Sequence, residues 1–142
     1  MTSINTKVIH NSGSSRVLTS YRDGIKRVIF SSGNMVRNEA VKSIQEHRSS
    51  GVTYEKYNPR RTHTASSAGK PPNTDTGYLA GNIHVVIDPD GMGCSVESRA
   101  DYSAALEFGT SDMAARPFMQ PALESQRRKI IQMFARIKAR GV

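Results

Sequence analysis

A long apolar stripe near the start of the chain constrains its fold more than any other feature. The members of the stripe recur at three- and four-residue steps: Leu18, Tyr21, Ile25, Val28, Ser32, Met35 or Val36, Ala40 and Ile44. This spacing places them on one face of an α-helix, which we predict from about Ser20 to Arg48. Ser20 is suited to cap this helix, and Asp23 to stabilise its first turn. Because the stripe is long, the rest of the fold has to pack along it.

Two glycines interrupt the predicted helix, and a polar segment precedes it. Gly24 and Gly33 each cost roughly 1 kcal/mol relative to alanine inside a helix, so a bend or break is expected near Ser31–Asn34. Residues 1–17 are polar and are predicted to form an N-terminal arm. The remaining residues, 18–142, suffice for one domain with a modest core.

Residues 49–74 show no sustained periodicity and are predicted to form a long loop within that domain. They are rich in Gly, Ser, Pro and Arg. An ordered loop of this length is uncommon in a compact domain unless a partner holds it. Apolar residues make up only 37% of the chain, and tryptophan is absent. Both features favour a protein that completes its buried surface with another subunit.

Strand patterns follow the predicted loop. Ile83–Ile87 and Met92–Arg99 alternate around Asp88–Gly91, which has strong turn chemistry, and are predicted to form a β-hairpin. Tyr102–Phe108 is predicted to be a third antiparallel strand that Gly109 ends.

A second helical pattern closes the chain, over Met119–Ala139. Leu123, Ile130, Phe134 and Ile137 form its apolar face. The predicted fold class is therefore α+β: a long N-terminal helix, an extended loop, a three-stranded antiparallel sheet and a C-terminal helix.

Charge is segregated along the chain. Residues 1–70 hold 12 Lys/Arg and 4 Asp/Glu, residues 71–113 hold 1 and 7, and residues 114–142 hold 7 and 1. A basic–acidic–basic order is typical of subunits that meet head to tail through unlike patches, and also of some nucleic-acid-binding proteins.

Several classes of protein are disfavoured. No apolar run approaches the roughly 20 residues that cross a bilayer, and residues 1–10 lack the apolar core of a secretory signal. Cys94 is the single cysteine, which excludes an intramolecular disulfide and a cysteine-based metal site. We therefore expect synthesis in the cytoplasm and no membrane partner.

Catalytic motifs are sparse. Asp75-Thr76-Gly77 is the triplet of retroviral-type aspartic proteases, but polar and proline residues precede it where an apolar strand is required. The favoured interpretation is a turn or helix cap in which Asp75 accepts backbone N–H groups. The four histidines share no metal-ligand spacing, and phosphate-binding and nucleophile-elbow loops are absent. We predict no enzyme, no metal and no cofactor.

Aromatic and basic residues interleave at Tyr54, Lys56, Tyr57, Arg60 and Arg61. Such interleaving suits stacking on bases and neutralisation of a nucleic-acid backbone. No recognisable nucleic-acid-binding motif frames them. Lys56, Arg60 and Arg61 are therefore candidate phosphate contacts without sequence specificity.

Three ordered stretches resemble one family, the tail-completion or neck proteins of lambda-like long-tailed bacteriophages. They are Tyr54–Leu79, Ala100–Thr110 and Ala115–Leu123. The motifs that carry the resemblance are Asp75-Thr76-Gly77, Glu107-Phe108-Gly109 with Thr110, and Arg116-Pro117-Phe118. The chain departs from the pattern at Lys70, where an acidic residue is common, and at Ser103, where alanine is frequent.

The resemblance implies a non-catalytic virion protein, made in the host cytoplasm, that forms a ring, typically a hexamer. The ring would join the tail to the DNA-filled head. Its implied partners are copies of itself, head-completion or connector proteins, tail-terminator or tail-tube proteins, and the packaged double-stranded DNA. We expect Glu107 and Arg116 to make structural hydrogen bonds or an ion pair, within or between subunits. The alternatives are a tail terminator of the same virion and a nonspecific DNA-binding protein.

Overall fold

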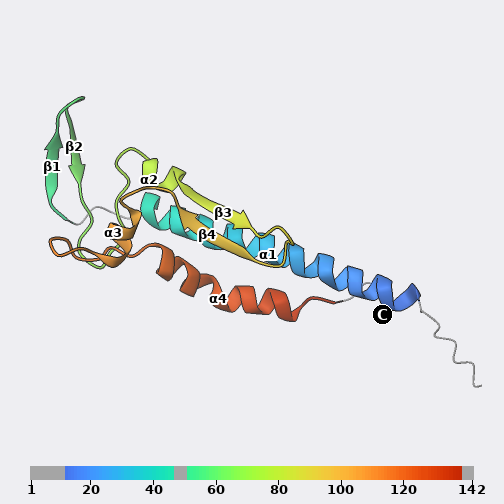
Figure 1. Ribbon diagram of the computed structural model, residues 1–142. Coiled ribbons are helices and arrows are strands. Elements are labelled where there is room, and N and C mark those ends of the chain that lie inside the picture. The colour runs from blue at the N-terminus through green and yellow to red at the C-terminus, as the bar shows by residue number, and fades with distance from the viewer. Residues whose placement is uncertain (1–11, 47–50, 139–142) are drawn as a thin grey trace, which may run out of the picture.

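The computed structural model describes residues 12–46 and 51–138 and is elongated, with one helix along most of its length (Figure 1). In chain order, its elements are α1 (Ser12–Glu46), β1 (Thr53–Lys56), β2 (Arg61–Thr64), α2 (Tyr78–Gly81), β3 (Ile83–Ile87), β4 (Cys94–Ser98), α3 (Ser103–Phe108) and α4 (Met119–Ala135). The fold is α+β with a long helix first and a helix last, as predicted.

Helix α1 is longer than the helix predicted from the sequence, and it is unbroken. It begins at Ser12, so Ser20 lies inside the helix and does not cap it, and the predicted arm includes six helical residues. Residues 1–11 of that arm, and Arg48 at the other predicted end, lie outside the described residues. The helix also continues through Gly33 without a break.

Close packing explains why both glycines sit inside α1. A Cβ atom on Gly24 would lie 2.9 Å from Cγ2 of Ile137, and one on Gly33 would lie 2.6 Å from Cγ1 of Val85. Gly24 therefore lets the segment after α4 approach α1, and Gly33 lets β3 approach it. The helix propensity lost at these positions is offset by packing.

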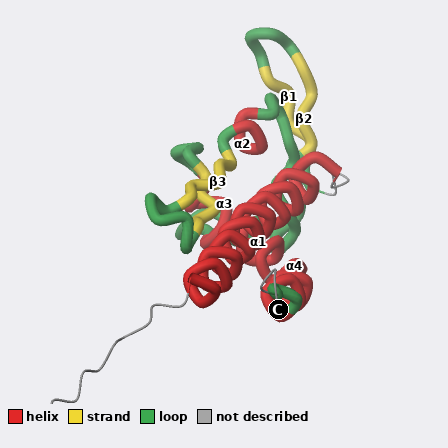
Figure 2. Tube along the Cα trace, turned by 90° about the vertical axis from the view of Figure 1, so that its right-hand side faces the viewer, coloured by secondary structure: helices red, strands yellow, loops and turns green. Residues whose placement is uncertain are grey.

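The core lies where β3–β4 and α4 cover the C-terminal half of α1. Figure 2 shows α1 obliquely, with β3 and α4 on different sides of it. Val36, Ala40 and Ile44 of the predicted stripe are buried together with Ile83 and Phe118. Leu18 and Tyr21, from the other end of the stripe, are exposed. This end of the stripe is therefore largely uncovered by the described residues.

The predicted three-stranded sheet is wrong, because the structure has two separate two-stranded sheets. The β3–β4 hairpin is confirmed, with Ile83 opposite Ser98 and Ile87 opposite Cys94. Residues Ser103–Phe108, predicted as a third strand, form α3. The run from Ala104 to Glu107 consists of good helix formers, and this local preference prevails over the alternating pattern.

The predicted loop over residues 49–74 contains the antiparallel pair β1–β2, with Thr53 opposite Thr64 and Lys56 opposite Arg61. Threonine and tyrosine dominate these strands, and both favour β-structure. Helix α4 begins at Met119, as predicted, and ends at Ala135, whereas Ala139 lies outside the described residues. Among the described helices, none is both long and apolar enough to cross a membrane.

Candidate functional site

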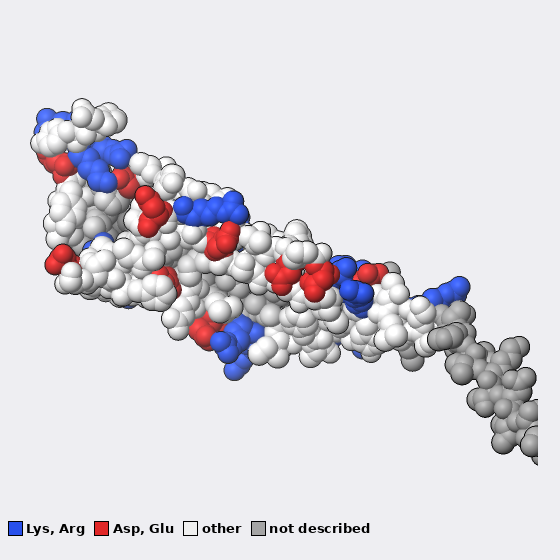
Figure 3. Space-filling model, in the orientation of Figure 1, with Lys and Arg blue, Asp and Glu red and all other residues white. Residues whose placement is uncertain are grey.

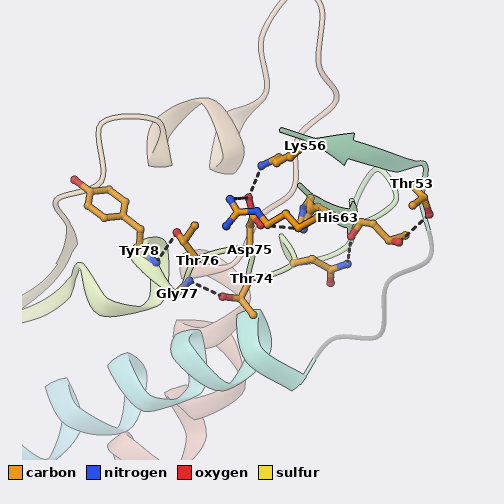
Figure 4. Close-up of polar contacts among 11 residues, drawn as sticks. Thr53, Lys56, His63, Thr74, Asp75, Thr76, Gly77 and Tyr78 are labelled. Atoms are coloured by element: carbon orange, nitrogen blue, oxygen red, sulfur yellow. Dashed lines mark hydrogen bonds and ion pairs between the residues drawn. The ribbon is translucent and has the colours of Figure 1, made fainter. Parts of the chain in front are cut away.

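A carboxylate surrounded by three basic side chains joins the β1–β2 hairpin to the rest of the protein (Figure 4). Lys56 Nζ and Arg61 Nη2 both donate to Oδ2 of Asp75, the latter at 3.2 Å, and His63 Nδ1 lies 3.7 Å from Oδ1. The hydrogen bond from Lys56, aided by the charges of Arg61, Lys56 and His63, holds the pKa of Asp75 below its ordinary value. Asp75 therefore acts as a charged anchor for the hairpin.

The backbone turn around Asp75 is made by its two threonine neighbours. Gly77 N donates to Thr74 Oγ1 at 3.1 Å, and Tyr78 N donates to Thr76 Oγ1 at 3.3 Å. Gly77 has a φ of 78°, which glycine adopts without strain. The prediction that Asp75 itself caps the turn is therefore wrong: the threonine hydroxyls accept the N–H groups, and the carboxylate faces the hairpin cations.

Replacing Asp75 by asparagine should weaken the protein only where Asp75 is ionised. Because the folded-state pKa lies below the ordinary 3.8, the ion pairs stabilise the fold above that pH and lose their effect as pH falls through the folded pKa. We expect Asp75→Asn to lose about 0.5–1 kcal/mol at pH 7, a size typical of exposed pairs. Urea unfolding at neutral and strongly acidic pH measures this difference. Asp101→Asn is the control, because Asp101 is exposed and makes no ion pair among the described residues. A loss independent of pH would contradict this role.

Glu107 organises the start of α4. Its carboxylate accepts three backbone N–H groups, from Phe118 at 2.8 Å, Met119 at 3.0 Å and Gln120 at 2.9 Å. These are N–H groups that a helix start leaves without intrahelical partners, and the negative charge also suits the helix dipole. Glu107 thus locks α3 to α4 across the intervening loop.

The other motif residues around Glu107 have separate roles. Arg116 N donates to Leu106 O at 2.6 Å, while Arg116 Nε is buried without a hydrogen-bond partner among the described residues. The described residues show no ion pair between Glu107 and Arg116. Pro117 is half-buried and leads into Phe118, a core residue that is 1% exposed. The two ends of this motif are therefore joined by backbone contacts and by the Glu107 cap.

Removing the Glu107 carboxylate should release the start of α4. We expect Glu107→Ala to lower the free energy of unfolding by about 2 kcal/mol, because several charge-assisted hydrogen bonds are lost together. Denaturant unfolding followed by circular dichroism measures this loss. The matched control is Glu124→Ala, since Glu124 contacts Arg127 only across an exposed turn of α4 and should contribute under about 0.5 kcal/mol. Equal losses for the two variants would contradict the capping role.

An apolar groove of about 680 Å³ opens between β4, α1, α3 and α4. Its walls include Val96 from β4 and Leu123, Ile130 and Phe134 from α4. Phe108 also lines the groove, with 80% of its surface exposed. The helical spacing had predicted these α4 residues as one apolar face, and in the structure they line an open groove. The low apolar content of the chain is consistent with an apolar face that the chain itself leaves open.

The predicted phosphate contacts are neutralised by acids of the chain itself. Lys56 and Arg61 pair with Asp75, and Arg60 Nη2 lies 3.5 Å from Glu55 Oε2. Figure 3 shows blue and red side chains adjacent at the hairpin end of the visible face. This arrangement makes the hairpin a weaker phosphate site than its sequence indicates.

Cations without such partners gather on α1 and on the segment just after α4 instead. Among the described residues, no ion pair involves Arg16 or Arg27 of α1, nor Arg136 or Lys138 after α4. Two hollows share Arg27: one contains Arg16 together with Asp23, and the other contains Arg136 and Lys138. Sequence spacing gave no indication of this grouping, because the two segments are far apart in the chain.

The described residues contain no group of three or more His, Cys, Asp and Glu side chains placed to hold a metal ion. In comparisons with known proteins, no family model, curated protein or solved structure matches this chain.

Proposed function

We propose that this protein is a ring-forming structural subunit of the neck of a long-tailed bacteriophage, where it completes the tail and joins it to the DNA-filled head. The observation that carries the proposal is the open apolar groove, whose lining includes the exposed Phe108. A contiguous apolar surface of this kind normally marks a contact with another protein. Glu107, Phe108 and Phe118, which belong to motifs that resemble those of neck proteins, line the same groove.

A ring requires two different surfaces on each subunit, because one surface of each copy binds the other surface of its neighbour. The groove is a receiving surface, and the protruding β1–β2 hairpin lies on a different part of the molecule (Figure 1). The segregated charge along the chain adds a second complementarity between neighbours. These features support repeated head-to-tail contact better than a single isologous dimer.

Deleting the gene from the phage that encodes it tests the proposal. We expect DNA-filled heads and tails of normal length that fail to join, with infectivity restored by supplying the protein from a plasmid. Electron microscopy of the lysate distinguishes this result from the tail-terminator alternative, in which tubes of uncontrolled length would accumulate. Joined, infectious particles made without the protein would refute both assignments.

The cations of α1 and of the segment just after α4 favour one further role, a nonspecific contact with the backbone of duplex DNA. Unpaired arginines on a shared surface are suited to phosphate. If they bind DNA, affinity should fall steeply with salt, and Arg27→Glu with Arg136→Glu should flatten that dependence. The double variant Lys56→Glu with Arg61→Glu is the comparison, because those cations already pair with Asp75. A salt slope unchanged by Arg27→Glu with Arg136→Glu would exclude this surface.

A further inference from the structure

Strand β4 has a free edge that faces away from β3. Arg99 N donates to Asn82 O and Asp88 N donates to Gly93 O, which fixes the hydrogen-bonded positions of the β3–β4 ladder. Because these positions alternate in an antiparallel pair, the backbone groups of Cys94, Val96 and Ser98 point outward from the sheet. No hydrogen bond to these outward groups is found among the described residues.

This free edge borders the apolar groove. The side chains of Cys94, Val96 and Ser98 line the groove, and α4 forms its opposite wall. A strand added to β4 would lie about 4.8 Å from it, between β4 and α4 and over α1. Such a strand would supply both the missing backbone hydrogen bonds and the missing apolar cover.

The β1–β2 hairpin has the properties of a strand donor. All four residues of β1 are exposed, as is Val52 immediately before it. Ala65 N donates to Val52 O, so the backbone groups of Thr53 and Glu55 are on the outer edge of β1. Val52 and Tyr54, which are 63% and 53% exposed, lie on one face of the strand. A two-stranded hairpin of this size is marginally stable by itself and is stabilised when another strand pairs with it.

The charges of the two surfaces are complementary. With Asp75, which pairs with Lys56 and Arg61, the hairpin keeps a net positive charge of one: Lys56, Arg60 and Arg61 against Glu55 and Asp75. Residues 83–113, which contain β3, β4 and α3, carry six acidic residues against the single base Arg99. The hairpin is also anchored through Asp75 at one end of the molecule and extends away from the body of its own chain (Figure 1). A hairpin placed in this way is suited to reach a second copy of the chain.

We propose that β1 of one copy adds in parallel to the free edge of β4 in the next copy, and that Val52 and Tyr54 enter the apolar groove. Only parallel pairing places these two residues level with the outward-facing positions of β4, whose side chains line the groove. The result is a four-stranded sheet shared by two subunits, a known mode of recognition by strand addition. Each copy donates one hairpin and receives another, so the contact repeats head to tail. This inference rests on the ring-forming role proposed above and names the surfaces that form its interface.

The single native cysteine provides a direct test. Cysteine is introduced one position at a time at Val52, Thr53, Tyr54 and Glu55, and the purified full-length variants are oxidised with a catalyst. Alkaline pH is needed, because burial and the charge of Asp88 raise the pKa of the Cys94 thiol. Neighbouring strands bring paired Cα atoms within disulfide range, whereas a strand one further away is out of range. Thr62→Cys, on β2, is therefore the matched control, and each variant is repeated with Cys94→Ser.

We expect a ladder of disulfide-linked species beyond the dimer on a non-reducing gel, from Val52→Cys or Tyr54→Cys, whichever the register places opposite Cys94. Thr53→Cys, Glu55→Cys, Thr62→Cys and every Cys94→Ser form should give no ladder, because their side chains point elsewhere or lack a partner. Light scattering on the unoxidised samples separates the two proposals. Oligomers without a ladder from the Val52 or Tyr54 variants would overturn this inference alone, and so would a ladder from the Thr53 or Glu55 variants. A chain that stays monomeric would overturn it together with the ring-forming role.

Discussion

Replacing Phe118 by alanine should lower the free energy of unfolding by about 3–5 kcal/mol, the range for aromatic residues removed from a core. Phe118 is 1% exposed and is the largest of the fully buried side chains. It packs in the cluster formed by Val36, Ala40 and Ile83 at the point where α4 begins. Its loss would leave a cavity between α1 and α4 that this small core cannot close. Urea unfolding followed by circular dichroism measures the change.

Phe108 provides the comparison for Phe118, because it has the same side chain ten residues earlier with 80% of its surface exposed. Phe108→Ala should change the stability of the isolated chain by less than about 0.5 kcal/mol. If the groove is an assembly surface, the same substitution should reduce self-association in light scattering. Equal destabilisation by the two variants would contradict the prediction that the burial of Phe118 makes it important for stability.

The elements that could be predicted from the sequence are those whose patterns are long or strongly punctuated. The stripe from Val36 to Ile44 gave α1, and the Asp88–Gly91 turn gave the β3–β4 hairpin. The helix after Pro117 was predicted to begin at Met119, where it begins in the structure. Each of these signals is repeated over several residues, so tertiary packing does not override it.

Short patterns were ambiguous. Apolar and polar or small residues alternate in Tyr102–Phe108, as in a strand. The pattern is too short to be decisive, and the helix-forming residues from Ala104 to Glu107 belong to helix α3 in the structure. The β1–β2 pair lies in a polar segment in which apolar and polar residues do not alternate. The reason is that almost no side chain of this hairpin is buried. Burial normally produces the alternation from which strands are predicted, so an exposed hairpin is hard to detect.

The candidate site was predicted in its motifs but not in its contacts. Glu107 caps a helix start more than ten residues later, whereas a recognisable capping box spans three. Asp75 meets Lys56 and Arg61 only because a hairpin folds back toward it. Likewise, the apolar face of α4 does not reveal whether Leu123 and Phe134 meet the same chain or another one. Contacts between distant segments depend on the fold, and local spacing does not encode them.

Replacing Gly109 by alanine should destabilise the protein by about 3 kcal/mol or more, since two separate penalties act at this position. Gly109 has a φ of 77° and a ψ of 177°, a conformation that is essentially confined to glycine. An added Cβ would also lie 2.9 Å from both Ala115 N and Met113 O. These are backbone atoms of the loop that carries the chain from α3 toward α4, so the loop cannot yield without disturbing the Glu107 cap. Chemical unfolding measures the loss.

Two other glycines separate the contributions at Gly109. Gly69 has a φ of 74° with no atom within 4 Å of an added Cβ, so Gly69→Ala tests backbone strain alone and should lose about 1 kcal/mol. Gly81 has neither a positive φ nor a close neighbour, so Gly81→Ala should be neutral or slightly stabilising. The expected order of losses is Gly109, then Gly69, then Gly81. If Gly109→Ala were no worse than Gly69→Ala, the loop between α3 and α4 would be able to shift, and it would not hold Glu107 rigidly over the start of α4.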